Sequence, residues 1–246
     1  HKMRPVEDVL EELRAVAALG VRDVFFMDQT FGTNRERTMR LLEAMAPLAE
    51  PPRWLCFSRA DRATPDLLPL MKRAGCHTII YGIETADDEL LKSYHKGYTF
   101  GQVRDAMSAA RREGIRTVGT LIIGLPGDTP AGCDRTIDAV KTIACDFISV
   151  NIAAPRPATP MRRRAIDDGA VPEDLDRMDQ SGTFIAMEHG GFTRNEIMRL
   201  KRRAVREFYL NAPYMLRRIA GLRSPAHFAI EARQGLALLG NFVKGR

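Results

Sequence analysis

The chain has 246 residues, of which 45% are hydrophobic and 28% are charged, a balance typical of a single α/β domain. No apolar run reaches the roughly 18 residues of a membrane span, and we expect no secretory signal from the first residues. The net charge of +6 comes from residues 160–246, which hold 16 basic and 10 acidic side chains. Such an excess can meet nucleic acid or an anionic membrane, but a solvated helical face explains it more simply. Aromatic residues are sparse among the arginines, which disfavours RNA binding.

A repeated pattern organises the first 160 residues: a helix, a glycine, a short bridge, an apolar strand and a polar tip. The bridging glycines are Gly20, Gly75 and Gly114. Repeats of this kind build a parallel sheet or a barrel with its helices outside. The expected strands are residues 24–27 (a buried strand), 54–57, 78–81, 117–123 and 147–151. Five strands are too few for a closed eight-stranded barrel, so we expect a partial barrel or an open sheet.

Helix signals separate these strands. Four helices are expected first. One covers residues 6–19, and a second begins at a Thr33 or Asn34 cap. A third runs from Thr64-Pro65 to Gly75, and a fourth covers 87–92. Two more begin at a Thr99–Gln102 capping box and at Asp128 or Thr129. A proline-rich loop covers residues 153–160, and helices at 193–210, 213–220 and 225–242 follow it. We therefore expect two parts, residues 1–160 and an appended helical region at 161–246.

The cysteines Cys56, Cys76, Cys133 and Cys145 fit neither a zinc pattern nor a Cys-x-x-Cys pair. No two histidines stand at ligand spacing either, so no metal ligand is predicted. Buried free thiols in a reducing cytoplasm are the expectation.

The polar tips are the candidate site, because the loops after the strands carry the chemistry in such folds. Asp28 can accept from an ammonium or hydroxyl group, or it can start an Asx turn. Glu84, two residues after Gly82, suits ribose or ammonium recognition, or it can lie near a helix N-terminus. Arg59 can bind a carboxylate, or it can pair with Asp61.

Further tips follow two later strands. Gly124-Leu125-Pro126-Gly127 is a glycine-rich turn whose amides can face an anion or a cofactor, but it matches neither a P-loop nor a dinucleotide fingerprint. Asn151 and the loop from Ala153 offer hydrogen bonds to a flat heterocycle. These tips contain no Ser-His-Asp set, and no catalytic side chain is predicted.

The order of several motifs resembles that of the radical S-adenosylmethionine (radical SAM) superfamily, and closely its cobalamin-binding branch. The resemblance covers about residues 3–160. It rests on Met3-Arg4-Pro5-Val6-Glu7, Phe26-Met27-Asp28-Gln29-Thr30-Phe31, Ser58-Arg59-Ala60-Asp61, Gly75-Cys76, Gly82-Ile83-Glu84-Thr85, Gly124 to Thr129 and Ala154-Pro155-Arg156-Pro157.

The resemblance implies an α/β fold, a partial (β/α)6 TIM-like barrel whose first strand is missing here. It also implies S-adenosylmethionine beside a 4Fe–4S cluster, and radical functionalisation of a C–H bond, such as methylation or cyclisation. An upstream domain would hold cobalamin. A small-molecule substrate and a reductant such as flavodoxin or ferredoxin would be the partners.

The same resemblance assigns cofactor contacts. Asp28, Gln29 and Thr30 would lie at the methionine amine, Glu84 with Gly82 at the ribose or methionine, and Arg59 at the carboxylate. Gly124, Leu125 and Pro126 would lie along the cofactor, with Asn151 and Ala153 near the adenine.

One departure from the family is large. The family holds its cluster with Cys-x3-Cys-x2-Cys before the first helix, and the chain contains no such triplet. We expect the cluster ligands to lie upstream of His1, outside this chain, which alone would be inactive. The alternative is a non-catalytic nucleoside-binding or SAM-binding module, or a degenerate homologue that lost the cluster.

Overall fold

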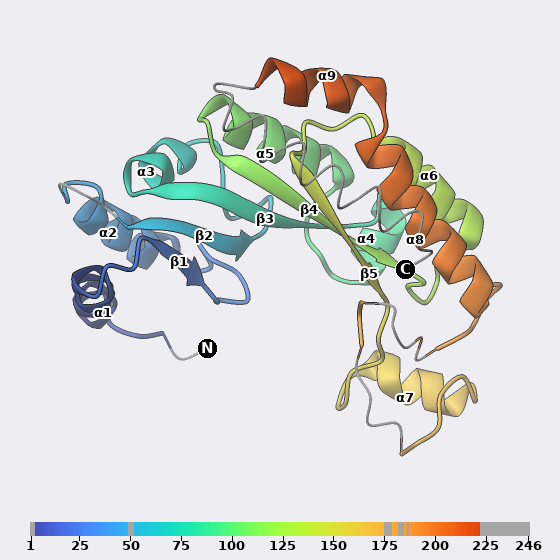
Figure 1. Cartoon of the computed structure of the whole chain (residues 1–246). Helices are drawn as coiled ribbons and strands as arrows, with labels where there is room; N and C mark the ends of the chain where they lie inside the picture. The colour runs from blue at the N-terminus through green and yellow to red at the C-terminus, as the bar shows by residue number, and fades with distance from the viewer. Residues whose placement is uncertain (1–2, 49–51, 175–178, 182–184, 186, 222–246) are drawn as a thin grey trace. The chain divides into compact units, whose positions relative to one another are not determined.

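The structure is a computed structural model, and it describes residues 3–48, 52–174, 179–181, 185 and 187–221 (Figure 1). The chain divides into two compact units. Unit 1 comprises His1–Leu121 and Ile143–Ser149, and unit 2 comprises Ile122–Thr142 and Val150–Arg246.

Five parallel strands confirm the predicted α/β class. They are β1 (Asp23–Phe26), β2 (Arg53–Ser58), β3 (Cys76–Glu84), β4 (Arg116–Ile123) and β5 (Phe147–Ile152), and they lie in chain order in one sheet. Figure 1 shows β1, β2 and β3 running alongside one another in unit 1. The strict chain order is the arrangement that successive strand–helix repeats produce.

The helices of unit 1 begin and end at the signals in the sequence. They are α1 (Val6–Ala18), α2 (Arg35–Met45), α3 (Leu68–Arg73), α4 (Asp88–Ser93) and α5 (Phe100–Arg112). Asn34 caps α2, and the capping box of Thr99 and Gln102 starts α5 as predicted. Gly20, Gly75 and Gly114 follow α1, α3 and α5 with positive φ, the backbone conformation that favours glycine after a helix.

The two faces of the sheet in unit 1 are buried unequally. The face that carries Trp54, Tyr81 and Gly119 is buried, and it packs against helices. The Trp54 indole nitrogen donates to the Ala74 carbonyl at the end of α3, at 2.8 Å. A Cβ on Gly119 would lie 3.3 Å from the Met107 side chain of α5. Side chains on the other face remain partly exposed.

Two expectations for unit 1 are wrong in detail. The first strand is not buried: Phe25 is 38% exposed and Met27 is 71% exposed, because β1 is the edge strand of the sheet and pairs only with β2. The helix expected from Thr64-Pro65 begins at Leu68, because the residues between them form a turn.

Unit 2 contains α6 (Pro130–Val140), α7 (Pro160–Asp167), α8 (Arg194–Tyr209) and α9 (Ala212–Ala220). Helices α8 and α9 confirm the predicted helices at 193–210 and 213–220, whereas α7 was not predicted. The helix expected at 225–242 lies outside the described residues. The domain boundary after residue 160 stays a prediction. Within the described ranges, no helix combines the length and apolar character needed to cross a bilayer.

Ion pairs join α8 to α6, which lie side by side in Figure 1. Arg203 pairs with Asp134, and with Asp138 at 2.9 Å, while Lys141 pairs with Glu207 at 2.7 Å. Hydrogen bonds from Lys141 and then Arg203 lower the pKa of Glu207 to about 2. Some charged residues of the basic C-terminal part therefore hold α8 against α6.

This network predicts an acid-sensitive unit 2. A carboxylate with a lowered folded-state pKa stabilises the fold above its ordinary pKa of 4.5, and that contribution disappears as the pH falls towards 2. Glu207→Gln should therefore reduce the loss of stability between pH 6 and pH 3, and cost about 1 kcal/mol at pH 6. Urea unfolding followed by helical circular dichroism measures both. Glu188→Gln, an exposed control, should keep the wild-type pH dependence; an unchanged pH dependence in Glu207→Gln would contradict the prediction.

Candidate functional site

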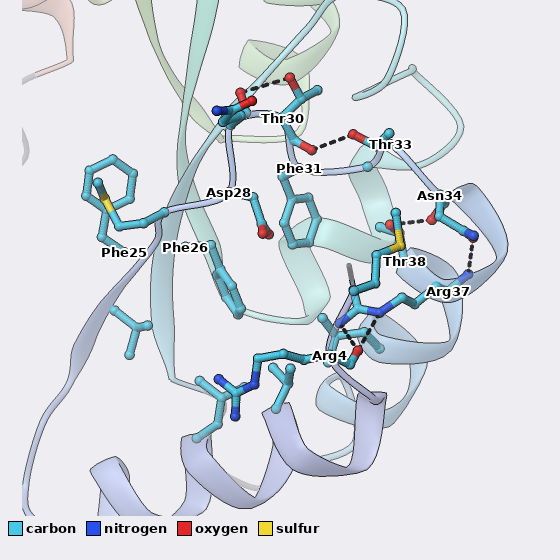
Figure 2. Close-up of a pocket in the computed structure, with 18 of the residues that line it drawn as sticks. Arg4, Phe25, Phe26, Asp28, Thr30, Phe31, Thr33, Asn34, Arg37 and Thr38 are labelled. Carbon is cyan, nitrogen blue, oxygen red and sulfur yellow. Dashed lines mark hydrogen bonds between the residues drawn. The ribbon is translucent and has the colours of Figure 1, made fainter. Parts of the chain in front are cut away.

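A cavity of about 1000 Å³ lies in unit 1 at the end of β1 (Figure 2). Four predicted cofactor residues line it: Asp28, Gln29, Thr30 and Arg59. Apolar residues of α1, β1 and α2 form much of the remaining lining, including Leu13, Val24 and Leu41. The structure therefore brings the first strand tip and Arg59 together.

Backbone and aromatic contacts hold the loop that carries Asp28. The Phe31 amide donates to the Phe57 carbonyl at 2.8 Å, and the Ser58 hydroxyl donates to the Phe31 carbonyl at 2.9 Å. The Phe31 ring packs against Phe26 and Trp54, with centroids 5.5 and 5.0 Å apart.

The Asp28 carboxylate is exposed, and it lies on the same side of β1 as Phe26 and Phe31 (Figure 2). It makes no hydrogen bond or ion pair within the described ranges, so the alternative of an Asx turn is not observed there. A carboxylate held at a cavity without a protein partner can accept from a ligand.

Arg59 is already engaged by protein groups. Its Nε and Nη2 donate to the two carboxylate oxygens of Asp61, at 2.8 and 3.1 Å, and Nη2 also donates to the Lys96 carbonyl. The guanidinium lies 5.2 Å from the centre of the Tyr98 ring. The alternative of pairing with Asp61 is thus observed, and a ligand contact by Arg59 would have to use Nη1 or displace Asp61.

Glu84 ends β3 in a strained conformation. Its φ of 63° lies in the left-handed region, which non-glycine residues rarely adopt and which often marks functional sites. Its Oε1 accepts from the Lys96 ammonium at 2.7 Å, and its side chain is only 14% exposed. The expected alternative, a charge stabilised by the following helix, is therefore not its main interaction.

Gly82 makes room for this carboxylate. A Cβ on Gly82 would lie 2.8 Å from Glu84 Oε1, and the Gly82 carbonyl accepts from the Tyr98 hydroxyl at 2.9 Å. Burial, and then the charge of Glu84, raise the pKa of Tyr98. Tyr98 therefore stays a neutral donor. Neither Gly82 nor Glu84 lines the cavity of Asp28, but Lys96 contacts both Glu84 and Arg59.

The remaining predicted contacts lie in unit 2. Residues 125–128 form a turn closed by the Asp128 amide on the Leu125 carbonyl at 2.9 Å, with Pro126 second and Gly127 third at a φ of 90°. The Asp128 carboxylate accepts from the Thr129 amide at 2.7 Å. The backbone amides of Asp128 and Thr129, which could otherwise face an anion, therefore already donate to protein acceptors.

Two hydrogen bonds to backbone carbonyls fix the start of this turn and the end of β5. The Gly124 carbonyl accepts from His189 Nε2 at 2.9 Å, and the Ala153 amide donates to the Ile123 carbonyl at 2.9 Å. Asn151 is half-buried in β5, and its side chain makes no hydrogen bond within the described part of the chain. Its amide thus remains available to a ligand.

A family model, the Radical SAM superfamily, matches residues 1–140, more than half of the chain. The chain belongs to the radical SAM superfamily. The match agrees with the resemblance that the polar tips suggested, and the members of this superfamily are enzymes.

Relatives of this radical SAM chain are larger proteins. An uncharacterized methyltransferase of Pyrococcus horikoshii is 29% identical over 87% of the chain and 47% of the relative. The hopanoid C-2 methylase of Rhodopseudomonas palustris is 26% identical over 72% of the chain and 35% of the relative. The chain thus spans between about a third and a half of the length of these relatives.

Solved structures confirm the TIM-like radical SAM fold. The radical S-adenosylmethionine methyltransferase TsrM from Kitasatospora setae, with tryptophan and a SAM analogue bound, gives a TM-score of 0.63 at 21% identity. That match covers 77% of this chain and 42% of the other. Coproporphyrinogen III oxidase from Escherichia coli gives a TM-score of 0.51 at 20% identity.

The thiols of this radical SAM chain do not fit an iron–sulfur cluster. Such a cluster needs thiolates gathered at one place. All four cysteines are free and buried, and no metal-binding group of three side chains occurs among the described residues. Burial raises the pKa of Cys56 and Cys133, and raises that of Cys145 to about 12. The expected buried free thiols are confirmed, and burial keeps those of Cys56, Cys133 and Cys145 protonated.

Sequence reasoning missed three residues that contact the predicted site of this radical SAM chain. Lys96 and Tyr98 contact Glu84, Arg59 and Gly82, and His189 contacts Gly124. The only local signal was the glycine next to Lys96 and the glycine pair after His189. The contacts of Lys96 and His189 span 12 and 65 residues of sequence, so local patterns do not reveal them.

Proposed function

We propose that this chain is the S-adenosylmethionine-binding part of a cobalamin-dependent radical SAM enzyme that methylates or cyclises a small molecule at a C–H bond. The superfamily match carries the proposal. The fold likeness to a methyltransferase whose structure contains cobalamin and a 4Fe–4S cluster supports the choice of branch. The named relatives that act as methylases point in the same direction.

By the family resemblance, the strand-tip residues of unit 1 would meet the polar parts of the proposed cofactor, although Asp28 lines the cavity and Glu84 does not. The Asp28 carboxylate, which has no partner among the described residues, would accept from the methionine ammonium group, with Gln29 and Thr30 beside it. Glu84 would accept from the ammonium or a ribose hydroxyl, with its backbone strain fixing the carboxylate at the strand tip. Arg59 would contribute positive charge near the carboxylate.

By the family resemblance, the later strand tips would meet the nucleoside. The Gly124 to Pro126 segment would lie along the cofactor, and Asn151 and Ala153 would lie near the adenine. S-adenosylmethionine supplies a hydrogen-abstracting radical or a methyl group once it is cleaved. The residues of this chain would orient it.

The cluster belongs outside this chain in our proposal. The buried, dispersed thiols do not fit it, and the chain covers less than half of its relatives' length. The ligands, the first strand and a cobalamin domain would therefore come from elsewhere in a longer protein. A flavodoxin or ferredoxin would supply electrons, and the free thiols agree with a reducing cytoplasm.

The test uses the full-length protein that contains this chain, reconstituted under anaerobic conditions. We expect an electron paramagnetic resonance signal of a reduced 4Fe–4S cluster and release of 5′-deoxyadenosine or S-adenosylhomocysteine from S-adenosylmethionine. A protein without the signal and without either product would reject the enzyme. Saturable calorimetric binding of S-adenosylmethionine by such a protein would instead favour the non-catalytic binding module.

A further inference from the structure

One face of the sheet in unit 1 carries a set of partly exposed apolar side chains, which we term the apolar floor. The strand register places them together: Phe25 pairs with Leu55, Phe57 pairs with Ile80, and Ile80 pairs with Val118. Phe25 and Phe57 also contact each other, with ring centroids 5.1 Å apart. Side chains two residues apart on a strand share a face, so the five residues form one surface.

This surface differs from the opposite face of the same strands. The neighbouring residues Trp54, Cys56, Ile79, Tyr81 and Thr117 are buried. Leu55, Phe57, Ile80 and Val118 are only half-buried, and Phe25 is exposed. In a closed barrel, layered side chains fill this inner face completely. Half-exposed rows indicate that the floor is not filled by the described protein.

Charge is confined to the two ends of the floor. Asp23 and Arg53 pair one row before it, at the start of β1 and β2, and the register places Thr78 and Arg116 in the first row, beside Phe25 and Leu55. Gly82 and Thr120 pair one row beyond it, and Glu84 follows two residues after Gly82 on β3. Ile80 lies two residues before Gly82, a separation of about 7 Å along the strand. The apolar rows therefore end directly below the predicted cofactor contacts.

We infer that the apolar floor holds the substrate, and that the substrate presents an apolar, ring-containing part to it. This inference rests on the proposed function. Its basis is the chemistry of the surface: two contacting phenylalanine rings and three aliphatic side chains favour a flat apolar group, and they offer no partner to a charged or highly hydroxylated one. The location under Glu84 places that group within reach of cofactor chemistry.

The test uses the full-length protein and the neutral two-ring probe N-phenyl-1-naphthylamine in a fluorescence titration. We expect saturable binding that weakens about tenfold in Phe57→Asn, which replaces the ring with a polar amide, and about threefold in the nearly isosteric Val118→Thr, which adds a hydroxyl to the floor. Leu19→Asn, which changes an apolar side chain that is 81% exposed in the same unit, is the matched control and should bind as wild type.

Two results would overturn the inference. One is unchanged probe affinity in both floor variants, which would place the probe elsewhere, such as in the cavity of Asp28. The other is displacement of the probe by D-ribose. Calorimetry with S-adenosylmethionine on the wild type and the same variants separates the two proposals. A wild-type protein that does not bind the cofactor rejects the proposed function. Floor variants that bind the cofactor normally but no longer bind the probe support the inference about the floor.

Discussion

Gly75→Ala should destabilise unit 1 by about 4 kcal/mol, or prevent it from folding, because two costs combine at this residue. Its φ of 97° is strained for any side chain, and an added Cβ would overlap the Pro52 carbonyl oxygen. That oxygen is backbone, so it cannot rotate away. The Gly75 carbonyl also accepts from the Trp54 amide at 3.1 Å, so movement of the bridge disturbs β2. Urea unfolding measured by far-UV circular dichroism gives the free energy of unfolding.

Gly20→Ala is the matched control. Gly20 follows α1 as Gly75 follows α3, with a φ of 78°, but a Cβ there would meet nothing within 4 Å. We expect a loss of only about 1 kcal/mol, the backbone cost alone. Equal losses in the two variants would show that the close approach to Pro52 contributes nothing.

Glu84→Gln should weaken S-adenosylmethionine binding to the full-length protein by about 30-fold. A hydrogen bond between a carboxylate and an ammonium or hydroxyl group contributes about 2 kcal/mol, and the amide keeps the shape while losing the charge. The ion pair with Lys96 is also lost, which should cost about 1 kcal/mol of stability, since the Glu84 side chain is largely buried but Lys96 is 31% exposed. Calorimetry gives the dissociation constant, and thermal unfolding checks that the variant is folded.

Glu89→Gln removes the same charge from the exposed surface of α4 and serves as the control. It should bind the cofactor as wild type does. A folded Glu84→Gln protein with undiminished affinity would leave Glu84 as a structural partner of Lys96 and remove it from the cofactor site.

The order and class of the elements could be predicted because their signals are local. Gly20, Gly75 and Gly114 each follow a helix with positive φ, at the positions that the repeat predicted. Asn34, Thr99 and Thr129 cap the helices that follow them. The helix α7 starts with Thr159 as its cap and Pro160 in its first turn, the same signal that Thr129-Pro130 gives for α6. It was missed because the preceding prolines suggested a continuous loop.

Burial and partners could not be predicted in the same way, because both depend on distant parts of the chain. The sequence of β1 is as apolar as that of β2, yet its position at the sheet edge leaves Phe25 exposed. The residue types at Asp28, Arg59 and Glu84 were suggestive. Only the fold shows that Arg59 already pairs with Asp61 and Glu84 with Lys96. Asp28, in contrast, lacks a partner among the described residues.

The chain's one tryptophan, Trp54, is wholly enclosed between β2 and the end of α3 in unit 1. Its fluorescence emission therefore reports the unfolding of unit 1 and does not report that of helices α8 and α9. Far-UV circular dichroism measures the helices of both units. Comparing the two signals in one denaturation experiment reveals whether the units unfold as a single cooperative block or one after the other. In the second case, acid that loosens the Glu207 ion pairs would shift the ellipticity curve and leave the indole signal in place.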